Sequence, residues 1–429
     1  MQEILFETSS NKYLYLNNNI LYLPSNFYEE INNLSNDPDN YYSKKYSFLK
    51  KCFLDTKKAI SFKTAISSNV IEKNIENLRQ LLIEVTDDCN LACEYCGYGK
   101  LYSNYDERNG KKQSFKQVKI LLDYLIDKWR FSNNYSYKNK IFIGFYGGEP
   151  LLNFRLIQQV IDYLNSIEID NIEFKYNMTT NGVLLSRYMD YLSENNVDIL
   201  ISLDGNEYNH SYRVTKNGKS SFELIYNNIK KIRNKYPEYY DNYINFNAVL
   251  HNRNSFDEIV NFINTEFNKV PKVSELSKVG ISSEKVDDFN EMFQIKFDES
   301  QKKIDVHQES DIEYILNDPD VAIFNLFIDS FVGNAYTSLL DLFEQENSYE
   351  YLPTGTCLPF QKKMFLTVNG KLLQCEKIGQ NFPLGYVDSK QVHIDHLHII
   401  NLYSHLYSKI VNQCKNCFTW NNCGNVFFY

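Results

Sequence analysis

The 429-residue sequence has no hydrophobic run that approaches the ~20 apolar residues of a membrane span. Residues 1–16 also lack the basic start and apolar core of a secretory signal peptide. Positive charge is scarce, because 45 lysines and arginines face 54 aspartates and glutamates, which gives a formal net charge of −9. We therefore expect a cytoplasmic protein that binds neither a membrane nor nucleic acid, since binding to phosphates needs a basic face.

Disulfides are also not expected in a chain without a secretory signal. Its nine cysteines indicate metal or redox chemistry instead. Cys52 lies far from every motif, and we predict that it is a buried free thiol. The other eight cysteines form two groups, one within residues 89–96 and one after residue 350.

The first group has the spacing Cys-x3-Cys-x2-Cys and directly follows a short apolar, strand-like run, residues 81–85. Three thiolates from one loop can bind three irons of a [4Fe–4S] cluster and leave the fourth iron open to a small molecule. A structural zinc site usually takes four ligands from two separated pairs, and no histidine or second pair stands nearby. We therefore predict that Cys89, Cys93 and Cys96 are iron–sulfur ligands.

This spacing, with the aromatic Tyr95 just before the last cysteine, resembles the signature of the radical S-adenosylmethionine (SAM) enzymes. The resemblance implies that SAM binds the open iron and that an electron from the reduced cluster cleaves it. The resulting 5′-deoxyadenosyl radical would abstract a hydrogen atom from the substrate. The chain would then be an oxidoreductase that needs a low-potential electron donor of the flavodoxin or ferredoxin type.

From about residue 80 the sequence alternates between strand and helix patterns. We expect strands at 141–146, 174–178, 197–203 and 243–250, with a weaker one near 279–281. Helices are expected from about residues 114, 154, 184, 221 and 255, the first with a capping box from Ser114 to Gln117. Such alternation implies parallel βα units. Six units predict an α/β fold, a partial (β/α)6 TIM-type barrel with its chemistry at the carboxyl ends of the strands.

Further regions flank this barrel, and we divide the chain into residues 1–78, 79–284, 285–352 and 353–429. Alternating runs on either side of residues 17–19 predict an N-terminal hairpin, followed by helical patterns. Residues 285–352 read as a helical linker that is amphipathic through 321–342. Near the C-terminus, Asn369-Gly370 predicts a second hairpin.

Three further strand ends carry residues that suit parts of SAM. Gly147 and Gly148 allow the backbone to approach a ligand closely, and Glu149 follows them. In radical SAM enzymes a motif of this kind holds the amino group of methionine. Asn181 stands in a strand-to-helix turn, and the sequence leaves open whether it contacts the ligand or only shapes the turn.

The fourth strand ends in Ser202-Leu203-Asp204-Gly205, where alternation puts Ser202 and Asp204 on one side of the strand. There they would bond the ribose hydroxyls or the methionine carboxylate. The motif followed by His210 and Arg213 resembles the peptide-modifying branch of the radical SAM superfamily. Arg213 would pair either with the SAM carboxylate or with a neighbouring acid.

The second group of cysteines resembles the SPASM domain of radical SAM peptide maturases, which usually has seven or more cysteines for two auxiliary clusters. Here Phe427 stands where a sixth cysteine would follow. We favour one auxiliary [4Fe–4S] cluster, as in the related twitch domain; two partly ligated clusters and a zinc site are the alternatives. The candidate ligands are Cys357, Cys375, Cys414 and Cys417, with Cys423 as a ligand in the two-cluster alternative.

The SPASM-like tail and the long segment before the cysteine loop favour a ribosomally made precursor peptide as the substrate. Residues 1–78 resemble the element that grips leader peptides, although a cap over the barrel would fit the same pattern. The product would be a thioether or carbon–carbon cross-link. The alternatives are an anaerobic sulfatase-maturating enzyme, which forms formylglycine, and a non-catalytic iron–sulfur protein that binds peptides. The intact cysteine loop counts against the latter.

Overall fold

The computed structural model describes residues 64–131, 139–170, 172–294 and 358–415, together with 3–7, 12–16, 19–23, parts of 41–48, 61–62 and 350–351. The chain divides into two compact units. The first comprises residues 1–66, 307–356 and 400–426, and the second comprises 67–306, 357–399 and 427–429. The cysteine loop and all the strand ends considered above belong to the second unit.

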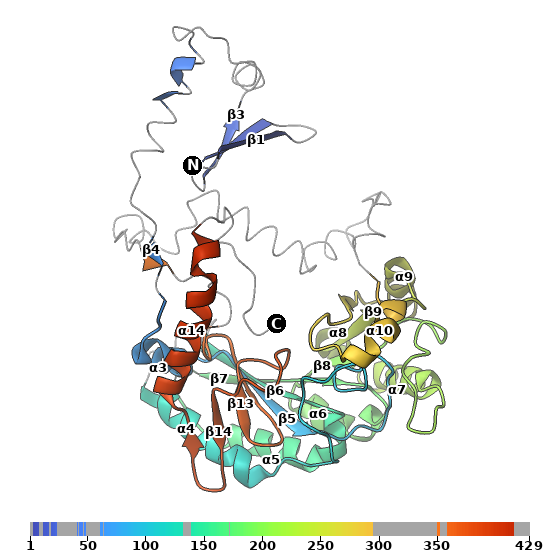
Figure 1. Ribbon diagram of the computed structural model, residues 1–429. Coiled ribbons are helices and arrows are strands. Elements are labelled where there is room, and N and C mark those ends of the chain that lie inside the picture. Colours follow the sequence, from blue (N-terminus) through green and yellow to red (C-terminus); the bar gives the residue numbers. More distant parts are fainter. Residues whose placement is uncertain are drawn as a thin grey trace. The chain divides into compact units, whose positions relative to one another are not determined.

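Parallel strands form the centre of the second unit (Figure 1). They follow one another in the sheet in the order of the chain. All neighbouring pairs among them are parallel. This arrangement confirms the predicted α/β fold with a partial (β/α)6 barrel. The strands are β5 (Gln80–Thr86), β6 (Lys140–Gly147), β7 (Glu173–Thr180), β8 (Asp198–Ser202), β9 (Ile244–Leu250) and β10 (Lys272–Glu275).

Helices connect these strands and cover the outer face of the sheet. On β6, the alternate residues Ile141, Ile143 and Phe145 are completely buried, whereas Phe142 and Tyr146 on the inner face are half-buried. The core therefore lies between the sheet and its helices, and the inner face lines the barrel. The helices are α4 (Phe115–Phe131), α5 (Phe154–Asn165), α6 (Met189–Glu194), α7 (Phe222–Lys235), α8 (Pro237–Tyr243) and α9 (Phe256–Phe267).

Further short elements complete the second unit. Two 3-10 helices, η2 (Pro150–Asn153) and η3 (Leu185–Arg187), follow strands β6 and β7. Helix α3 (Ser68–Glu76) precedes β5, and η4 (Ser283–Lys285) and α10 (Val286–Met292) follow β10.

The sequence placed the last barrel strand wrongly. The last strand was expected near residues 279–281, but it is β10 at Lys272–Glu275. Ile281 makes only an isolated bridge to Tyr102. Gly280 adopts a φ of +73°, which ends extended structure there. Within β10 only Val273 is buried, so the strand is too short and has too few apolar residues to show the alternation that marks a strand.

Two helix predictions also need correction. The helix expected from residue 184 is a short 3-10 turn, η3, followed by α6. At the start of α4, the Gln117 backbone N–H donates to the Ser114 hydroxyl at 3.3 Å, which is half of the predicted capping box. The Gln117 side chain donates to the Val387 carbonyl at 2.6 Å instead of returning to Ser114. A tertiary contact therefore replaces the local one.

The C-terminal segment adds strands to the barrel sheet. Strand β12 (Lys363–Leu366) pairs in parallel with β5 and antiparallel with β13 (Lys371–Leu373), followed by β14 (Gly385–Val387) and β15 (Val392–His393). The predicted Asn369-Gly370 hairpin is thus confirmed. Gly370 takes a φ of +84°, which a residue with a side chain rarely adopts.

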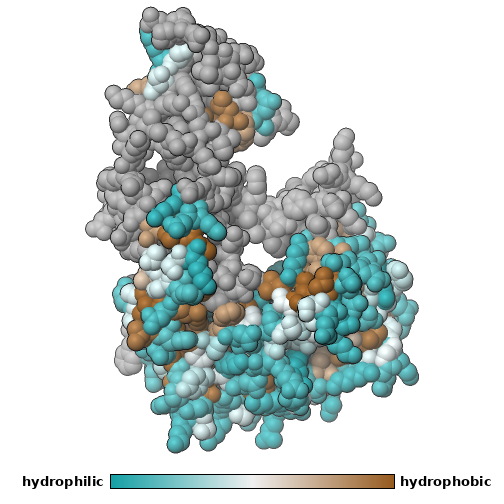
Figure 2. Space-filling model, in the orientation of Figure 1, coloured by the Kyte–Doolittle hydropathy of each residue, from teal (hydrophilic) through white to brown (hydrophobic). Residues whose placement is uncertain are grey.

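In the first unit, β2 (Lys12–Leu16) and β3 (Asn19–Leu23) form the predicted hairpin, and β1 (Glu3–Glu7) adds a strand that the sequence did not predict. Short strands β4 (Ser61–Phe62) and β11 (Glu350–Tyr351) pair in parallel, and most of α14 (His396–Cys414) belongs here. The expected amphipathic stretch 321–342 lies outside the described residues. Among the described helices, none is long and apolar enough to cross a membrane. The surface seen in Figure 2 is mostly hydrophilic where it is described.

Candidate functional site

The carboxyl ends of the parallel strands border a cavity of about 600 Å³. This is the end at which barrel enzymes place their chemistry. Most of the residues predicted for the cysteine loop and the SAM site line it: Cys89, Cys93, Cys96, Gly147, Gly148, Asn181, Ser202 and Arg213. Three others, Tyr95, Glu149 and Asp204, are buried in contact with these wall residues.

The cysteine loop follows β5 and is held by a short antiparallel pairing with the segment after β8. The Ala92 N–H donates to the Val214 carbonyl at 2.7 Å, and the Glu94 N–H donates to the Tyr212 carbonyl at 3.1 Å. An isolated antiparallel bridge between Leu91 and Thr215 continues the same register. The loop is therefore held by backbone hydrogen bonds to the segment after β8.

The three thiols of this loop are free and half-buried. Burial raises the pKa of Cys89 to about 11 and that of Cys93 to about 12. Such thiols stay protonated at neutral pH unless a cation compensates the thiolate charge, and metal binding would therefore release protons. The Cys89 sulfur already accepts a hydrogen bond from the Leu91 N–H at 3.4 Å.

The donor set fits an iron–sulfur cluster better than a single ion. Across the described residues, no group of three or more His, Cys, Asp or Glu side chains gathers around one point as a single metal ion requires. A [4Fe–4S] cluster takes one thiolate per iron, so its ligands need to border one cavity and not to meet at one atom. Cys89, Cys93 and Cys96 do border one cavity.

The turn after β6 is pressed against the cysteine loop. The Gly148 N–H donates to the Thr86 carbonyl at 2.9 Å, and the Glu149 N–H donates to the Asp88 carbonyl at 2.8 Å. A Cβ on Gly148 would stand 1.9 Å from the Asp88 carbonyl oxygen, so only glycine fits. Gly147 has a φ of +125°, which equally excludes a side chain. The two glycines are therefore required by the contact with the loop.

The Glu149 carboxylate is completely buried and bonded within the fold. It accepts hydrogen bonds from the Thr180 hydroxyl at 2.7 Å, the Asn181 N–H at 2.8 Å and the Leu151 N–H at 3.1 Å. Burial raises the pKa of Glu149 to about 7, although these donors favour its ionised form. Glu149 thus ties the end of β6 to the end of β7.

Asn181 shapes the turn after β7, and its side chain also lines the cavity. Its side-chain carbonyl accepts a hydrogen bond from the Val183 N–H at 3.0 Å, which shapes the turn after β7. Its amide nitrogen donates to Asn90 at 2.7 Å and lies 3.7 Å from the Cys89 sulfur. The residue therefore lies in the cavity wall beside the first cysteine.

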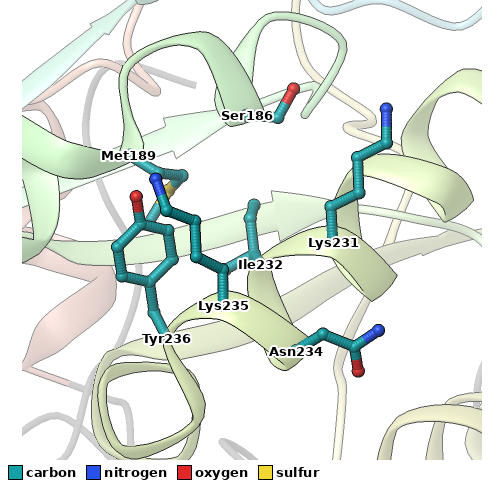
Figure 3. A pocket seen from close by; sticks show the side chains of 7 residues that line it. All are labelled: Ser186, Met189, Lys231, Ile232, Asn234, Lys235 and Tyr236. Atoms are coloured by element: carbon teal, nitrogen blue, oxygen red, sulfur yellow. The ribbon is translucent and has the colours of Figure 1, made fainter.

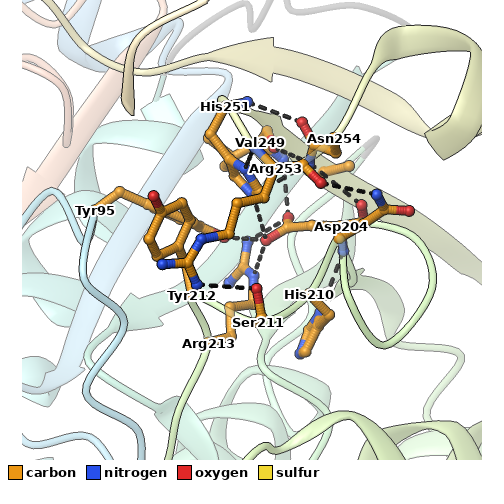
Figure 4. A network of polar contacts seen from close by, with 12 residues as sticks. Tyr95, Asp204, His210, Ser211, Tyr212, Arg213, Val249, His251, Arg253 and Asn254 are labelled. Atoms are coloured by element: carbon orange, nitrogen blue, oxygen red, sulfur yellow. Dashed lines mark hydrogen bonds and ion pairs between the residues drawn. The ribbon is translucent and has the colours of Figure 1, made fainter. Parts of the chain in front are cut away.

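Arg213 pairs with a neighbouring acid, which is Asp204. Its Nε and Nη2 donate to the two Asp204 oxygens at 2.8 and 3.1 Å (Figure 4). Asp204 also accepts from the Val249 N–H at 2.9 Å and from the Tyr95 hydroxyl. Burial alone would raise the pKa of Asp204, but the Arg213 cation and His251 hold it far below its usual value. Both Asp204 oxygens are thus occupied by donors of the protein itself.

His210 helps to hold this pair in place. Its Nδ1 accepts from the Asp204 N–H at 3.3 Å, and its Nε2 lies 3.1 Å from the Ser221 hydroxyl. That hydroxyl donates to the Arg213 carbonyl at 2.6 Å. Burial lowers the pKa of His210 to about 4, so the ring is neutral at physiological pH. The motif residues Asp204, His210 and Arg213 therefore position one another.

Comparison with known protein families finds a match in this part of the chain. Residues 83–265, less than half of the chain, match the model of the Radical SAM superfamily. We call this matched segment the radical SAM domain. It includes the cysteine loop and the strand ends from β5 to β9.

Curated relatives match part of the chain. An uncharacterized protein of Methanocaldococcus jannaschii is 36% identical over 34% of this chain and 46% of its own length. The radical SAM cyclopropyl synthase TigE of Paramaledivibacter caminithermalis is 29% identical over 47% of this chain and 41% of its own. A cysteine-type anaerobic sulfatase-maturating enzyme of Clostridium novyi is 34% identical over 39% of this chain and 43% of its own. The chain thus spans less than half the length of these relatives.

The second group of cysteines is described only in part. Cys375 follows β13 in the unit of the radical SAM domain and is half-buried. Cys414 ends α14 in the other unit and is buried. Cys357, Cys417 and Cys423 lie outside the described residues, as does Cys52. The predicted auxiliary ligand set therefore stays a prediction.

The cavity also has lining residues that the sequence reasoning missed. Tyr98 comes two residues after the last cysteine of the loop, and Tyr146 is the last inward-facing residue of β6. The Tyr98 ring packs edge-on against Tyr105, with centroids 4.7 Å apart. Glu376 and Lys377 reach the cavity from the segment after β13. Strand alternation could have identified Tyr146, whereas Glu376 and Lys377 depend on the pairing of β12 with β5.

A second cavity, of about 540 Å³, lies among the covering helices of the radical SAM domain (Figure 3). It contains none of the predicted site residues. Its lining comes from η3, α6 and α7 and consists of Ser186, Met189, Lys231, Ile232, Asn234, Lys235 and Tyr236. The strand-end cavity is therefore the candidate site.

Proposed function

We propose that the chain is a radical SAM enzyme that abstracts a hydrogen atom from a polypeptide substrate. The observation that carries this proposal is the gathering of three free thiols and three strand-end turns around one cavity. Cys89, Cys93 and Cys96 would hold a [4Fe–4S] cluster, and the turns after β6, β7 and β8 would hold SAM. When both are bound, the cluster supplies an electron that cleaves SAM to methionine and a 5′-deoxyadenosyl radical, which takes hydrogen from the substrate.

The residues of the chain would orient the cofactor and exclude water from this chemistry. Gly147 and Gly148 leave the backbone after β6 open to the cavity because they have no side chains. Asn181 and Ser202 add polar groups from the next two strands. Each element is anchored to its neighbour by hydrogen bonds, so the site would be formed before the ligand arrives.

Tyrosines would exclude water and hold the substrate on the other side of the cavity. Tyr98 packs against Tyr105, and its centroid lies 6.1 Å from that of Tyr146. The Tyr98 ring lines the cavity, and its hydroxyl is buried without a hydrogen-bond partner among the described residues. A cavity of about 600 Å³ admits a cofactor and the reacting side chain of a polypeptide, not a folded protein.

The names of two relatives support a polypeptide substrate and suggest which kinds of product to consider. A sulfatase-maturating enzyme acts on a protein, and a cyclopropyl synthase closes a ring with a carbon–carbon bond. We propose a precursor peptide as the substrate and a thioether or carbon–carbon cross-link as the product. Residues 1–78 would bind its leader, and one auxiliary cluster would accept the electron that the product radical gives up.

The 34% identity to the sulfatase-maturating enzyme favours formylglycine formation as a second candidate. The two products differ in composition. A cross-link removes two hydrogen atoms from each joined pair, one to the 5′-deoxyadenosyl radical and one as a proton whose electron leaves separately. Formylglycine formation from cysteine removes the sulfur and leaves an aldehyde.

Anaerobic co-expression with candidate precursor peptides encoded beside the gene, followed by intact and tandem mass spectrometry, tests the proposal. We expect a peptide that has lost two hydrogens per modified pair, with 5′-deoxyadenosine formed in step. The Cys93→Ala variant should abolish both. Sulfur loss from a sulfatase-derived peptide would select the second candidate, and absence of 5′-deoxyadenosine from cluster-loaded protein would contradict radical SAM activity altogether.

A further inference from the structure

The cysteine loop brings one particular cation against its middle cysteine. The hydrogen bonds from Ala92 to Val214 and from Glu94 to Tyr212 set the register of the antiparallel pairing. In this register Cys93 lies directly opposite Arg213, and the two hydrogen bonds lie on either side of this pair. The Cβ atoms of such directly opposed residues are typically ~4.5–5.5 Å apart, and their side chains share one face. Both side chains line the cavity.

Asp204 fixes where this cation can lie. It binds Arg213 through two hydrogen bonds, at 2.8 and 3.1 Å, and a planar guanidinium held in this way has little freedom to turn. The Tyr95 hydroxyl, from the cysteine loop itself, donates to the same carboxylate. The Arg213 guanidinium carbon also lies 5.3 Å from the centre of the Tyr95 ring. The cysteine loop and the Arg213 guanidinium therefore both bind the buried Asp204 carboxylate.

The charges that face Cys93 are few. The Arg213 cation lowers the pKa of Cys93, whereas Cys89, Cys96 and Asp204 raise it. Arg213 is 7% exposed and Asp204 is completely buried. Charges buried in this way are screened far less than charges at the surface. The next cation along the same segment, Lys216, is 60% exposed and pairs with Asp88 at 2.8 Å.

We propose that the buried Asp204–Arg213 pair sets the reduction potential of the cluster that Cys89, Cys93 and Cys96 would bind. The inference rests on the proposed function, since it requires that cluster. Reduction adds one negative charge, and a fixed cation beside a ligand sulfur stabilises the reduced form, which raises the potential. Asp204 acts on Cys93 in the opposite sense and more weakly than Arg213, and it keeps the rise small. Arg213 and Asp204 are positioning residues in this role, because they act through the cluster and not on the substrate.

Redox titrations of the anaerobically reconstituted full-length protein, followed by electron paramagnetic resonance without SAM, test this inference. Asp204→Asn leaves the cation uncompensated, so the potential should shift to a more positive value. Arg213→Lys keeps the charge and should stay closest to the wild type. The double variant Asp204→Asn/Arg213→Gln removes both charges, and its potential should lie below that of the wild type. Since it leaves no unpaired buried charge, it should fold better than Asp204→Asn.

Lys216→Gln is the matched control, because it removes a cation from the same segment at an exposed position. It should shift the potential less than any charge change in the buried pair. Equal potentials in all variants that retain the cluster, or a shift in Lys216→Gln as large as that in Asp204→Asn, would overturn the inference. Wild-type protein that binds no iron–sulfur cluster would contradict the proposed function instead, so the two failures are distinct.

Discussion

The turns after β6 and β8 both reach the cavity, and each buries a carboxylate completely, yet the two are stabilised in opposite ways. Glu149 accepts hydrogen bonds from Thr180 and from the backbone, and no described cation acts on it. Asp204 accepts hydrogen bonds as well, but two of them come from the Arg213 guanidinium. The same functional group therefore has two electrostatic environments at one site.

The difference shows what a buried cation contributes. Without one, the cost of burial prevails and raises the pKa of Glu149 to about 7. With one, the pKa of Asp204 stays far below its usual value, and its charge is permanent. The turn after β6 thus presents a carboxyl that can be neutral, whereas the turn after β8 presents a fixed ion pair beside the cysteine loop.

The largest effect should follow from removing the cation of the ion pair. Arg213→Leu leaves Asp204 buried, ionised and without its partner, which typically costs about 3–5 kcal/mol of folding free energy. Chemical denaturation of the purified variant measures this loss. The double variant Asp204→Asn/Arg213→Leu should recover much of it, because no unpaired charge remains. A single variant as stable as the wild type would show that the pair is not needed for folding.

The pH dependence of stability should separate the two kinds of carboxyl. Burial raises the pKa values of Glu84 and Glu149 from 4.5 to about 7. Between these values the folded chain holds protons that the unfolded chain has released. The stabilisation from the neutral carboxyls is therefore complete below pH 4.5 and is lost as the pH rises to about 7, by at most ~3 kcal/mol for each group.

Denaturation measured between pH 5 and 8 tests this expectation. The Glu149→Gln variant should have a flatter profile than the wild type, since it cannot titrate at this position. Asp204 should contribute no slope in this range, because it is ionised in both the folded and the unfolded chain. A wild-type profile without a decline toward neutral pH would contradict the raised pKa values.

A smaller loss is expected from a methyl group at the contact between the turn after β6 and the cysteine loop. Gly148→Ala would place a Cβ 1.9 Å from a backbone oxygen of Asp88, so the loop must shift, at a typical cost of about 1–3 kcal/mol. Iron bound after reconstitution should fall with it. Gly97→Ala is the matched control, because a Cβ there meets nothing within 4 Å. Equal iron content in both variants would show that the contact does not hold the loop.

The smallest effect should come from Thr180→Val, which removes one donor to Glu149 and keeps the shape of the side chain. The loss of this bond and of the one from the Gly182 N–H should cost about 1 kcal/mol. It should also raise the pKa of Glu149 further, so the decline in stability should move to higher pH. A variant with an unchanged midpoint of this decline would separate Thr180 from the titration of Glu149.

The parallel strands and several residues that line the cavity could be predicted from the sequence, because both depend on local patterns. Cys89, Cys93 and Cys96 have a diagnostic spacing, and Gly147 and Gly148 stand at the end of a clear strand. Contacts between distant segments could not be read in the same way. The partner of Arg213 depends on the turn after β8, and β10 has too little apolar alternation to be placed correctly.

The cavity wall formed by Glu376 and Lys377 depends on a feature that no local pattern contains. Strand β12 joins the barrel sheet beside β5, although they lie far apart in the sequence. This pairing brings the segment after β13 to the same cavity as the cysteine loop. The hairpin around Asn369-Gly370 was predictable from its turn residues, whereas its place in the sheet was not.

Electron paramagnetic resonance of the reduced, reconstituted protein with and without SAM tests the central claim most directly. If Cys89, Cys93 and Cys96 hold a [4Fe–4S] cluster with one open iron, SAM should change the spectrum of that cluster. The Cys93→Ala variant should lose both the signal and the change. A cluster spectrum that SAM leaves unchanged, or a protein that binds zinc in place of iron and sulfide, would contradict an open iron at this cavity.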